Sequence, residues 1–361
     1  MSLLLIISII FICCLILNVM IIKTKQYHGY LTNDLNKGPQ KIHSSEVPRI
    51  GSLPIFISLF ITLLLLKYFF NFNQPFVILN FQVLIIISIP AIIIGLLEDL
   101  FKDISISARL ITSITVGVIA SYWFNISLPD TGLKIIDQYT NIMYVLPLLT
   151  IFFFAGLINS INLIDGIDGL AGITSIIILF ALSRIAVNNL DFDNYFFINL
   201  IMANIFGFIV INWFTGTIFL GDAGAYLLGV ILAFVACQVL SNNNISLFNI
   251  LLIFCYPIWE ISYSIIRRAL NGVKIMKADN AHLHSLMYIV IKNKFLFKQQ
   301  YLTNFLPTLF LIPILAIGPL LSIYLYDKPK ILVLLFLILY IKLTFFYKIM
   351  NNIFKRFFNN T

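Results

Sequence analysis

Residues 77–97 read VILNFQVLIIISIPAIIIGLL, a run of 21 residues without a charged side chain that ends at the acidic pair Glu98-Asp99. An α-helix needs about 20 predominantly apolar residues to cross the hydrocarbon core of a bilayer. Ten further segments have the same character and lie at about 2–22, 53–70, 108–124, 142–158, 169–187, 196–213, 223–240, 247–265, 302–325 and 330–348. The sequence therefore predicts eleven membrane-spanning helices, or ten if the short 108–124 segment or the 196–213 segment does not span.

The composition of the whole chain also indicates a membrane protein. Of its 361 residues, 60% are hydrophobic and only 11% are charged, whereas soluble domains contain about 25% charged residues. This composition excludes a soluble globular protein, and we expect one all-α, polytopic transmembrane domain over residues 1–361. The net charge of +8 does not indicate a nucleic-acid partner, because the basic residues are spread over the loops between the spans.

The basic residues predict the orientation of the spans. If the first span runs from outside to inside, 18 of the 23 Lys and Arg residues lie on the cytosolic side. The five that remain outside are Lys67, Lys134, Arg184, Lys328 and Lys330. Most acidic residues and all four histidines fall on the cytosolic side as well, although the positive-inside rule hardly acts on Asp and Glu. An active site on the cytosolic face would explain this second asymmetry.

The stretch NSINLIDGIDG at 159–169 concentrates polar side chains at the end of a span. Its polar members recur every third residue and are Asn159, Asn162, Asp165 and Asp168. On a helix they would form one slowly winding polar ridge, and their oxygens are the ligand type that Mg²⁺ prefers. The alternative is a structural cap on the next span, which is disfavoured because four polar residues at membrane depth are costly.

Three acidic residues mark two further candidate positions. The adjacent carboxylates of Glu98 and Asp99 repel one another at a membrane boundary unless a cation or a phosphate-bound metal joins them. Asp222 opens the span 223–240, and Asn212 ends the span before it. Each position has a structural alternative, namely a solvated helix end for the acidic pair and a helix N-cap for Asp222.

His282 and His284 stand two residues apart, which places them on the same side of an extended loop. With Arg267 and Arg268 nearby, they indicate an anion-binding patch rather than a zinc site, because a third zinc ligand at the usual spacing is missing. The alternative for the arginines is a topological one, since basic residues anchor the cytosolic ends of spans.

Two other charged residues stand out. Arg49 lies between Pro48 and Gly51, in a turn that would present its guanidinium to a phosphate near the membrane surface. Taken alone, this segment is an ordinary basic loop. Glu260 lies inside the span 247–265, and we interpret it as a partner for the nearby basic residues rather than as a transport site.

In their order and spacing, these motifs together resemble those of the polyprenyl-phosphate N-acetylhexosamine-1-phosphate transferases, the WecA/MraY-like members of glycosyltransferase family 4. The resemblance covers roughly residues 20–300. The loop with Pro48, Arg49 and Gly51 and the loop from Arg267 to His284 resemble the WecA branch more than the peptidoglycan branch.

The resemblance implies transfer of N-acetylhexosamine-1-phosphate from a UDP-sugar to polyprenyl (undecaprenyl) phosphate, with release of UMP, at the cytosolic face of the bacterial inner membrane. Such a step starts a lipid-linked cell-envelope glycan, as in O-antigen or cell-wall synthesis. The implied cofactor is Mg²⁺, with Mn²⁺ as an alternative, and the implied ligands are Asn162 and Asp222. Besides the two substrates, the implied partner is the lipid bilayer, and a homodimer is left open.

The resemblance also implies roles for single residues. Catalytic roles fall to Glu98, Asp99 and Asp222, with the acidic pair handling the prenyl phosphate and Asp99 as the favoured carboxylate. Phe219 matches a position that stacks on uracil. The full set implied in substrate binding is Arg49, Asn159, Asp165, Asp168, Asn212, Phe219, Arg268, His282 and His284.

Some residues depart from the family pattern. Glu98 replaces the first Asp of an Asp-Asp pair, which is a conservative change between acids. The other departures bear on sugar preference and are Ser52, Thr215, Thr217 and Ser285. They keep a catalytically inactive homologue as an alternative. A transporter or scaffold is the other alternative, although transport sites lie near the membrane midplane, whereas these polar groups gather at one face.

Overall fold

The computed structural model describes residues 3–33, 47–69, 74–140, 142, 144–272, 281–295 and 300–359. This part of the chain is helical and has no β-strand, which confirms the predicted all-α class. In chain order the helices are α1 (Leu3–Lys23), α2 (Lys25–Thr32), α3 (Ser52–Leu64), α4 (Pro75–Phe101), α5 (Ile106–Val118), α6 (Lys134–Thr140), α7 (Val145–Ile164), α8 (Leu170–Asn188), α9 (Phe192–Thr215), α10 (Gly221–Asn242), α11 (Asn249–Ile253), α12 (Cys255–Leu270), α13 (Leu283–Phe295), α14 (Gln300–Leu325) and α15 (Pro329–Asn359). π-helical turns extend α3 over Leu65–Phe69 and α5 over Ile119–Trp123.

Ten helices among the described residues are long and apolar enough to cross a membrane. The two segments that the sequence left open are both among them, as Ile106–Trp123 and as α9. The predicted span 247–265 is instead divided into α11 and α12, which meet at Phe254. The physical reason is Pro257, whose ring nitrogen has no hydrogen to donate to the preceding turn, so that one continuous helix is broken there.

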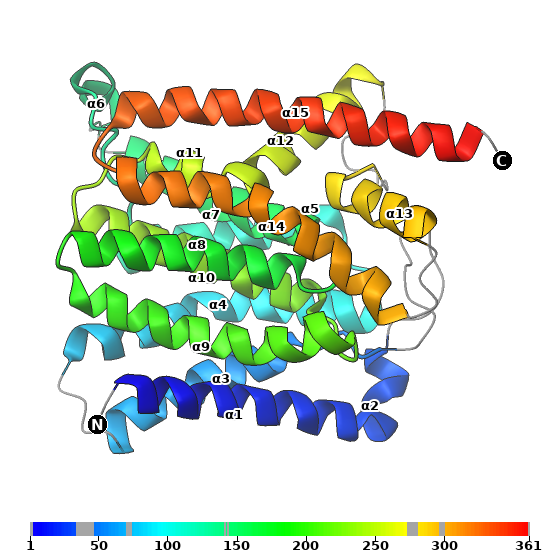
Figure 1. Ribbon diagram of the computed structural model, residues 1–361. Coiled ribbons are helices and arrows are strands. Elements are labelled where there is room, and N and C mark those ends of the chain that lie inside the picture. Colours follow the sequence, from blue (N-terminus) through cyan, green and yellow to red (C-terminus); the bar gives the residue numbers. More distant parts are fainter. Residues whose placement is uncertain are drawn as a thin grey trace.

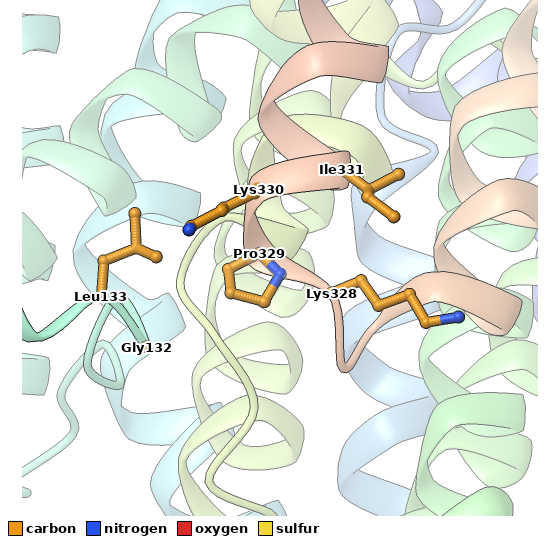
Figure 2. Close-up of a pocket in the computed structure, with 6 residues that line it drawn as sticks. All are labelled: Gly132, Leu133, Lys328, Pro329, Lys330 and Ile331. Carbon is orange, nitrogen blue, oxygen red and sulfur yellow. The ribbon is translucent and has the colours of Figure 1, made fainter.

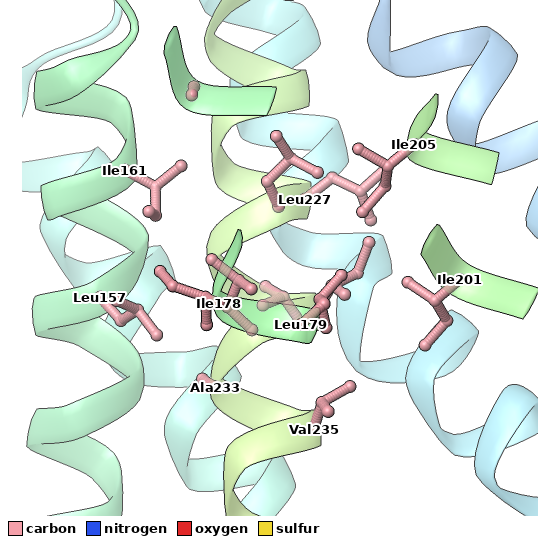
Figure 3. Packing of buried hydrophobic residues seen from close by; sticks show 14 of the residues in the cluster. Leu157, Ile161, Ile178, Leu179, Ile201, Ile205, Leu227, Ala233 and Val235 are labelled. Carbon is pink, nitrogen blue, oxygen red and sulfur yellow. The ribbon is translucent and has the colours of Figure 1, made fainter. Parts of the chain in front are cut away.

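Helix α10 lies inside the bundle (Figure 1) and packs against α3, α4, α7, α8 and α9. Nearly all of its side chains are buried. Figure 3 shows part of this core, where aliphatic side chains from four helices meet. Those labelled are Leu157, Ile161, Ile178, Leu179, Ile201, Ile205, Leu227, Ala233 and Val235. Along most of its length, α10 is therefore surrounded by protein.

Glycines set the distance between α10 and two of its neighbours. A Cβ atom on Gly95 of α4 would lie 2.3 Å from the Cα atom of Ala223, and one on Gly229 of α10 would lie 2.5 Å from the Cα atom of Ile158 on α7. In lipid, helices associate through such close van der Waals contact, because lipid chains are as apolar as the side chains. The glycines thus bring the ends of α4, α7 and α10 within hydrogen-bonding distance.

The helix ends gather at two opposite ends of the bundle. At one end α4 and α7 finish where α10 begins, and their polar side chains bond to Asp222 and its backbone. We call this the site end. At the opposite end α10 finishes beside the start of α9, where the Asn243 amide donates to the Asp191 carboxylate over 2.8 Å.

The close contact at Gly229 predicts that Gly229→Ala destabilises the protein by about 1–3 kcal/mol, because a backbone must shift to admit the methyl group. Thermal unfolding of the purified protein in detergent measures this. Gly156→Ala on α7 is the matched control, since a Cβ atom there meets nothing within 4 Å. Equal unfolding temperatures for the two variants would contradict the role of Gly229 in packing.

Candidate active site

The first turn of α10 carries the carboxylate at the centre of the candidate site. One Asp222 oxygen, Oδ1, accepts a hydrogen bond from Asn162 Nδ2 of α7 over 2.7 Å. The same oxygen lies 3.9 Å from Nη2 of Arg49, which belongs to the segment before α3. The Asp222 side chain keeps 19% of its surface exposed and that of Arg49 keeps 30%. Both predicted residues are therefore open to a ligand.

Asp99, unlike its neighbour Glu98 in the acidic pair, bonds to the first turn of α10. Its Oδ1 accepts from the backbone N–H of Asp222 over 2.9 Å, and its Oδ2 accepts from that of Ala223 over 3.0 Å. The Asp99 side chain is only 1% exposed. It caps the N-terminus of α10 from α4, and the helix dipole favours a negative charge there. This placement favours a positioning role for Asp99 over direct contact with a lipid phosphate.

Gly221 makes this cap possible. Its φ of +75° lies in the left-handed region that favours glycine. A Cβ atom there would lie 2.6 Å from Asp99 Oδ2 and 2.3 Å from the carbonyl oxygen of Arg49. The carboxylate can reach the helix N-terminus only because this residue has no side chain.

Glu98 forms a separate contact with α5. Its Oε1 lies 3.6 Å from Nη1 of Arg109, and its Oε2 accepts from the backbone N–H of Ile104 over 3.0 Å. The hydroxyl of Tyr226, one turn beyond Asp222 on α10, also interacts with Arg109. The sequence analysis missed Arg109, although a charged residue inside a predicted span is a signal that could have found it.

The Asn-Asp stretch is only partly helical. Helix α7 ends at Ile164, and a turn leads to Gly169, whose φ is +79°. The interpretation of all four polar residues as one helical ridge is therefore wrong for Asp165, which caps the end of α7, and for Asp168, which lies in the turn beyond it. Asn159 stays on α7, where its amide donates to Ser113 Oγ of α5 over 3.0 Å.

Several carboxyl groups lie close together at the site. Burial raises the pKa of Asp165 to about 8, against the opposing charge of Arg49. The nearby carboxylates that add to this rise are those of Asp222, Asp99 and Asp168. Among the described residues no group of three or more His, Cys, Asp or Glu side chains is arranged to hold a metal by itself. A cation at this site would therefore need oxygens from a bound ligand as well.

Asn212 and Phe219 hold the loops around the site together. The Asn212 side chain accepts from the backbone N–H of Gly169 and donates to the carbonyl of Ile218, both over 2.8 Å. The backbone N–H of Phe219 donates to the carbonyl of Pro48, and the carbonyl of Phe219 accepts from the backbone N–H of Gly51, both over 2.9 Å. These bonds fix the segment that carries Arg49. The implied contacts of Asn212 and Phe219 with substrate remain predictions.

The predicted histidine patch is buried rather than exposed. His282 and His284 are 5% and 2% exposed, and His284 Nε2 would lie 2.3 Å from a Cβ atom on Gly166. Their rings are parallel, at an angle of 1° and a centroid distance of 5.4 Å, although His284 lies in the first turn of α13 and not in the extended loop that the sequence predicted. Arg268 is half-buried in the last turn of α12, and its implied role in substrate binding remains a prediction.

A pocket of about 350 Å³ lies away from this site (Figure 2). Its lining comes from the segment before α6 and from the start of α15, and consists of Gly132, Leu133, Lys328, Pro329, Lys330 and Ile331. Helix α6 precedes α7, whose far end carries Asn162. The pocket is thus at the end of the bundle opposite the carboxylates and has no part in their chemistry.

The cap on α10 predicts the effect of Asp99→Ala on stability. Loss of both acceptors leaves two backbone N–H groups without their partner and lowers the free energy of unfolding by about 1–2 kcal/mol. Thermal unfolding in detergent measures this. Glu98→Ala is the matched control, because Glu98 bonds to Ile104 and Arg109 and not to α10. An Asp99→Ala variant as stable as the parent would contradict the cap.

The sequence is similar to those of known membrane transferases. Residues 81–240 match glycosyl transferase family 4. The chain is 30% identical over 68% of its length to an undecaprenyl-phosphate alpha-N-acetylglucosaminyl 1-phosphate transferase of Thermotoga maritima, of which it covers 69%. It is 27% identical over 68% of its length to a probable undecaprenyl-phosphate N-acetylglucosaminyl 1-phosphate transferase of Bacillus subtilis, of which it covers 66%. A phospho-N-acetylmuramoyl-pentapeptide-transferase of Bacillus licheniformis is 25% identical over 66% of the chain and is covered to 75%. The chain belongs to glycosyl transferase family 4.

Proposed function

We propose that this protein transfers N-acetylhexosamine-1-phosphate from a UDP-sugar to polyprenyl (undecaprenyl) phosphate and releases UMP. The observation that carries the proposal is the meeting of Asp222, Asn162 and Arg49 at the start of α10. It brings a carboxylate and an amide suited to a cation next to a guanidinium suited to a phosphate. The relatives from Thermotoga maritima and Bacillus subtilis, both named as undecaprenyl-phosphate transferases, support undecaprenyl phosphate as the acceptor.

We place the site end at the cytosolic face of a bacterial inner membrane. Lys23 ends α1 and Lys102 follows α4, both at helix ends that point the same way as the site. Among the described residues, fewer basic residues lie at the opposite end, and Lys134 and Lys330 are two of them. This distribution agrees with the positive-inside rule. A UDP-sugar made in the cytosol would reach the site from that side, while the lipid acceptor would enter from the bilayer.

The donor set fits a hard divalent cation. Mg²⁺ is usually bound by one or two carboxylates, with water and substrate phosphates completing its coordination. Asp222 and the amide oxygen of Asn162 would hold it, and Mn²⁺ is an alternative because it takes the same ligands. When bound, such a cation neutralises the charge of a diphosphate and makes UMP a better leaving group.

The reaction forms a bond between an oxygen of the lipid phosphate and the sugar-proximal phosphorus, and breaks the bond from that phosphorus to UMP. Phosphoryl transfer of this kind depends on positioning and charge neutralisation more than on covalent catalysis. The Arg49 guanidinium would bind phosphate oxygens beside Asp222. Asp99 would keep Asp222 in place through the α10 N-terminus, and Glu98 would position Arg109 at the edge of the site. We keep the other substrate-binding residues as the family resemblance implies them, namely Asn159, Asp165, Asp168, Asn212, Phe219, Arg268, His282 and His284.

The proposal predicts that Asp222→Asn lowers UMP release on the order of 100-fold or more, because the substitution removes the charge that would hold the cation. The assay uses isolated membranes with a UDP-sugar, polyprenyl phosphate and Mg²⁺. Asp193→Asn is the control, since Asp193 lies in the first turn of α9 at the opposite end, and its activity should stay within about two-fold of the parent. Normal turnover in Asp222→Asn would contradict the metal assignment.

Metal dependence gives a second prediction. Chelation with EDTA should abolish transfer, and added Mg²⁺ or Mn²⁺ should restore it. Asn162→Ala should raise the Mg²⁺ concentration needed for half-maximal activity by about ten-fold or more. Asn188→Ala, at the far end of α8, should leave that concentration unchanged. Full activity in EDTA would remove the cation from the proposal.

The same assay distinguishes the alternatives. Several UDP-N-acetylhexosamines are supplied in turn, because the geometry does not select the sugar. Turnover with one of them identifies the donor. If the parent protein releases no UMP with any of them, an inactive homologue becomes the better interpretation.

A further inference from the structure

A buried carboxylate outside the proposed reaction contacts one of the predicted histidines. Glu260 of α12 is only 1% exposed. Its Oε1 lies 3.0 Å from His282 Nδ1 and 3.4 Å from the backbone nitrogen of Leu283, both at the start of α13. A buried carboxylate is costly without such partners. The contact therefore fixes the ring of His282 with a proton on Nδ1, in the way that carboxylates orient histidines elsewhere.

His282 in turn contacts His284, which reaches the candidate site. The two rings are parallel, and Nε2 of His284 lies against Gly166 in the turn between Asp165 and Asp168. Burial and the neighbouring His282 hold the pKa of His284 well below 6.5, so its ring is neutral near pH 7. A continuous series of contacts thus joins α12 to the turn that carries two of the site's acids.

Two hydrogen bonds that hold α12 and the start of α13 in place do not involve Glu260. The Tyr347 hydroxyl of α15 donates to the carbonyl of Ala281 over 3.0 Å, and Trp259 Nε1 donates to Thr344 Oγ1 over 3.1 Å. Helix α12 and the start of α13 are both held against α15 by these bonds. Removal of the Glu260 carboxylate therefore takes away the 3.0 Å contact of His282 Nδ1 and leaves the weaker one with Ser264 Oγ at 3.3 Å, while the helices around the rings keep their contacts.

We propose that Glu260 is a positioning residue for the transfer reaction: it fixes His282 and, through the stacked rings, holds His284 against the Asn-Asp turn. The inference rests on the proposed function for its catalytic consequence. It assigns to Glu260 neither a transport role nor the pairing with basic residues that the sequence analysis expected. Glu260 on α12 contacts His282 at the start of α13, and His284 of α13 contacts the Asn-Asp turn. The carboxylate would therefore affect the site although it does not touch substrate.

The first test is a double-mutant cycle in the UMP-release assay. Glu260→Ala and His282→Ala should each lower kcat/KM at least ten-fold, and the double variant should be no worse than His282→Ala alone, because both changes break the same series of contacts. Glu260→Gln keeps an oxygen that accepts from Nδ1 and should stay within three-fold of the parent. Ser262→Ala is the control, since Ser262 bonds to α12 carbonyls and Tyr340 and not to the histidines. Losses that multiply in the double variant would overturn the proposal.

The second test does not require activity. Diethylpyrocarbonate labels accessible neutral imidazoles, and mass spectrometry locates the label. His284 should be protected in the parent and in Glu260→Gln and become labelled in Glu260→Ala. Gly166→Ala should also expose it, because the new methyl group displaces the ring, and this variant serves if Glu260→Ala does not fold. Unchanged protection in the folded variants overturns the inference, whereas a parent without turnover but with this labelling pattern overturns only the proposed function.

Discussion

The N-terminus of α10 is the constraint on which the site depends. A helix leaves its first backbone N–H groups without internal partners, and inside a bundle there is little water to satisfy them. Because α10 is buried along nearly its whole length, the chain must supply an acceptor of its own. Asp99 does so from α4. The capped turn then fixes Asp222, so a requirement of backbone chemistry also places the central carboxylate of the site.

The electrostatics of this turn explain why a cation belongs to the proposed reaction. The Asp222 carboxylate lies 3.9 Å from the guanidinium of Arg49 and close to the carboxyl groups of Asp99 and Asp165. Both proposed substrates carry phosphate groups, which carboxylates repel. A cation between them would offset this repulsion, and in the proposed site the side-chain oxygen of Asn162, whose amide nitrogen donates to Asp222, would be its second ligand.

The sequence predicted the spans because their length is set by the bilayer and their composition by lipid. It also predicted that Asp222, Asn162 and Arg49 belong together, through the family resemblance. It did not predict the division at Phe254, although Pro257 was a readable signal, nor the turn after Ile164, because a spacing of three residues suits a helix and a turn equally. Contacts between distant segments, such as that of Glu260 with His282, depend on which helices meet, and no local pattern encodes this.

The depth of the polar groups separates an enzyme from a transporter. Transport sites lie near the membrane midplane in broken helices. Within the described part of the chain, buried polar residues do occur inside the bundle, as where Asn204 of α9 bonds to Ser58 and Thr62 of α3. These groups satisfy one another and carry no charge, so they act as links between helices. The carboxylates around Asp222 lie instead where helices end. The two proposed substrates, a lipid phosphate at the membrane surface and a water-soluble sugar nucleotide, would meet at that depth.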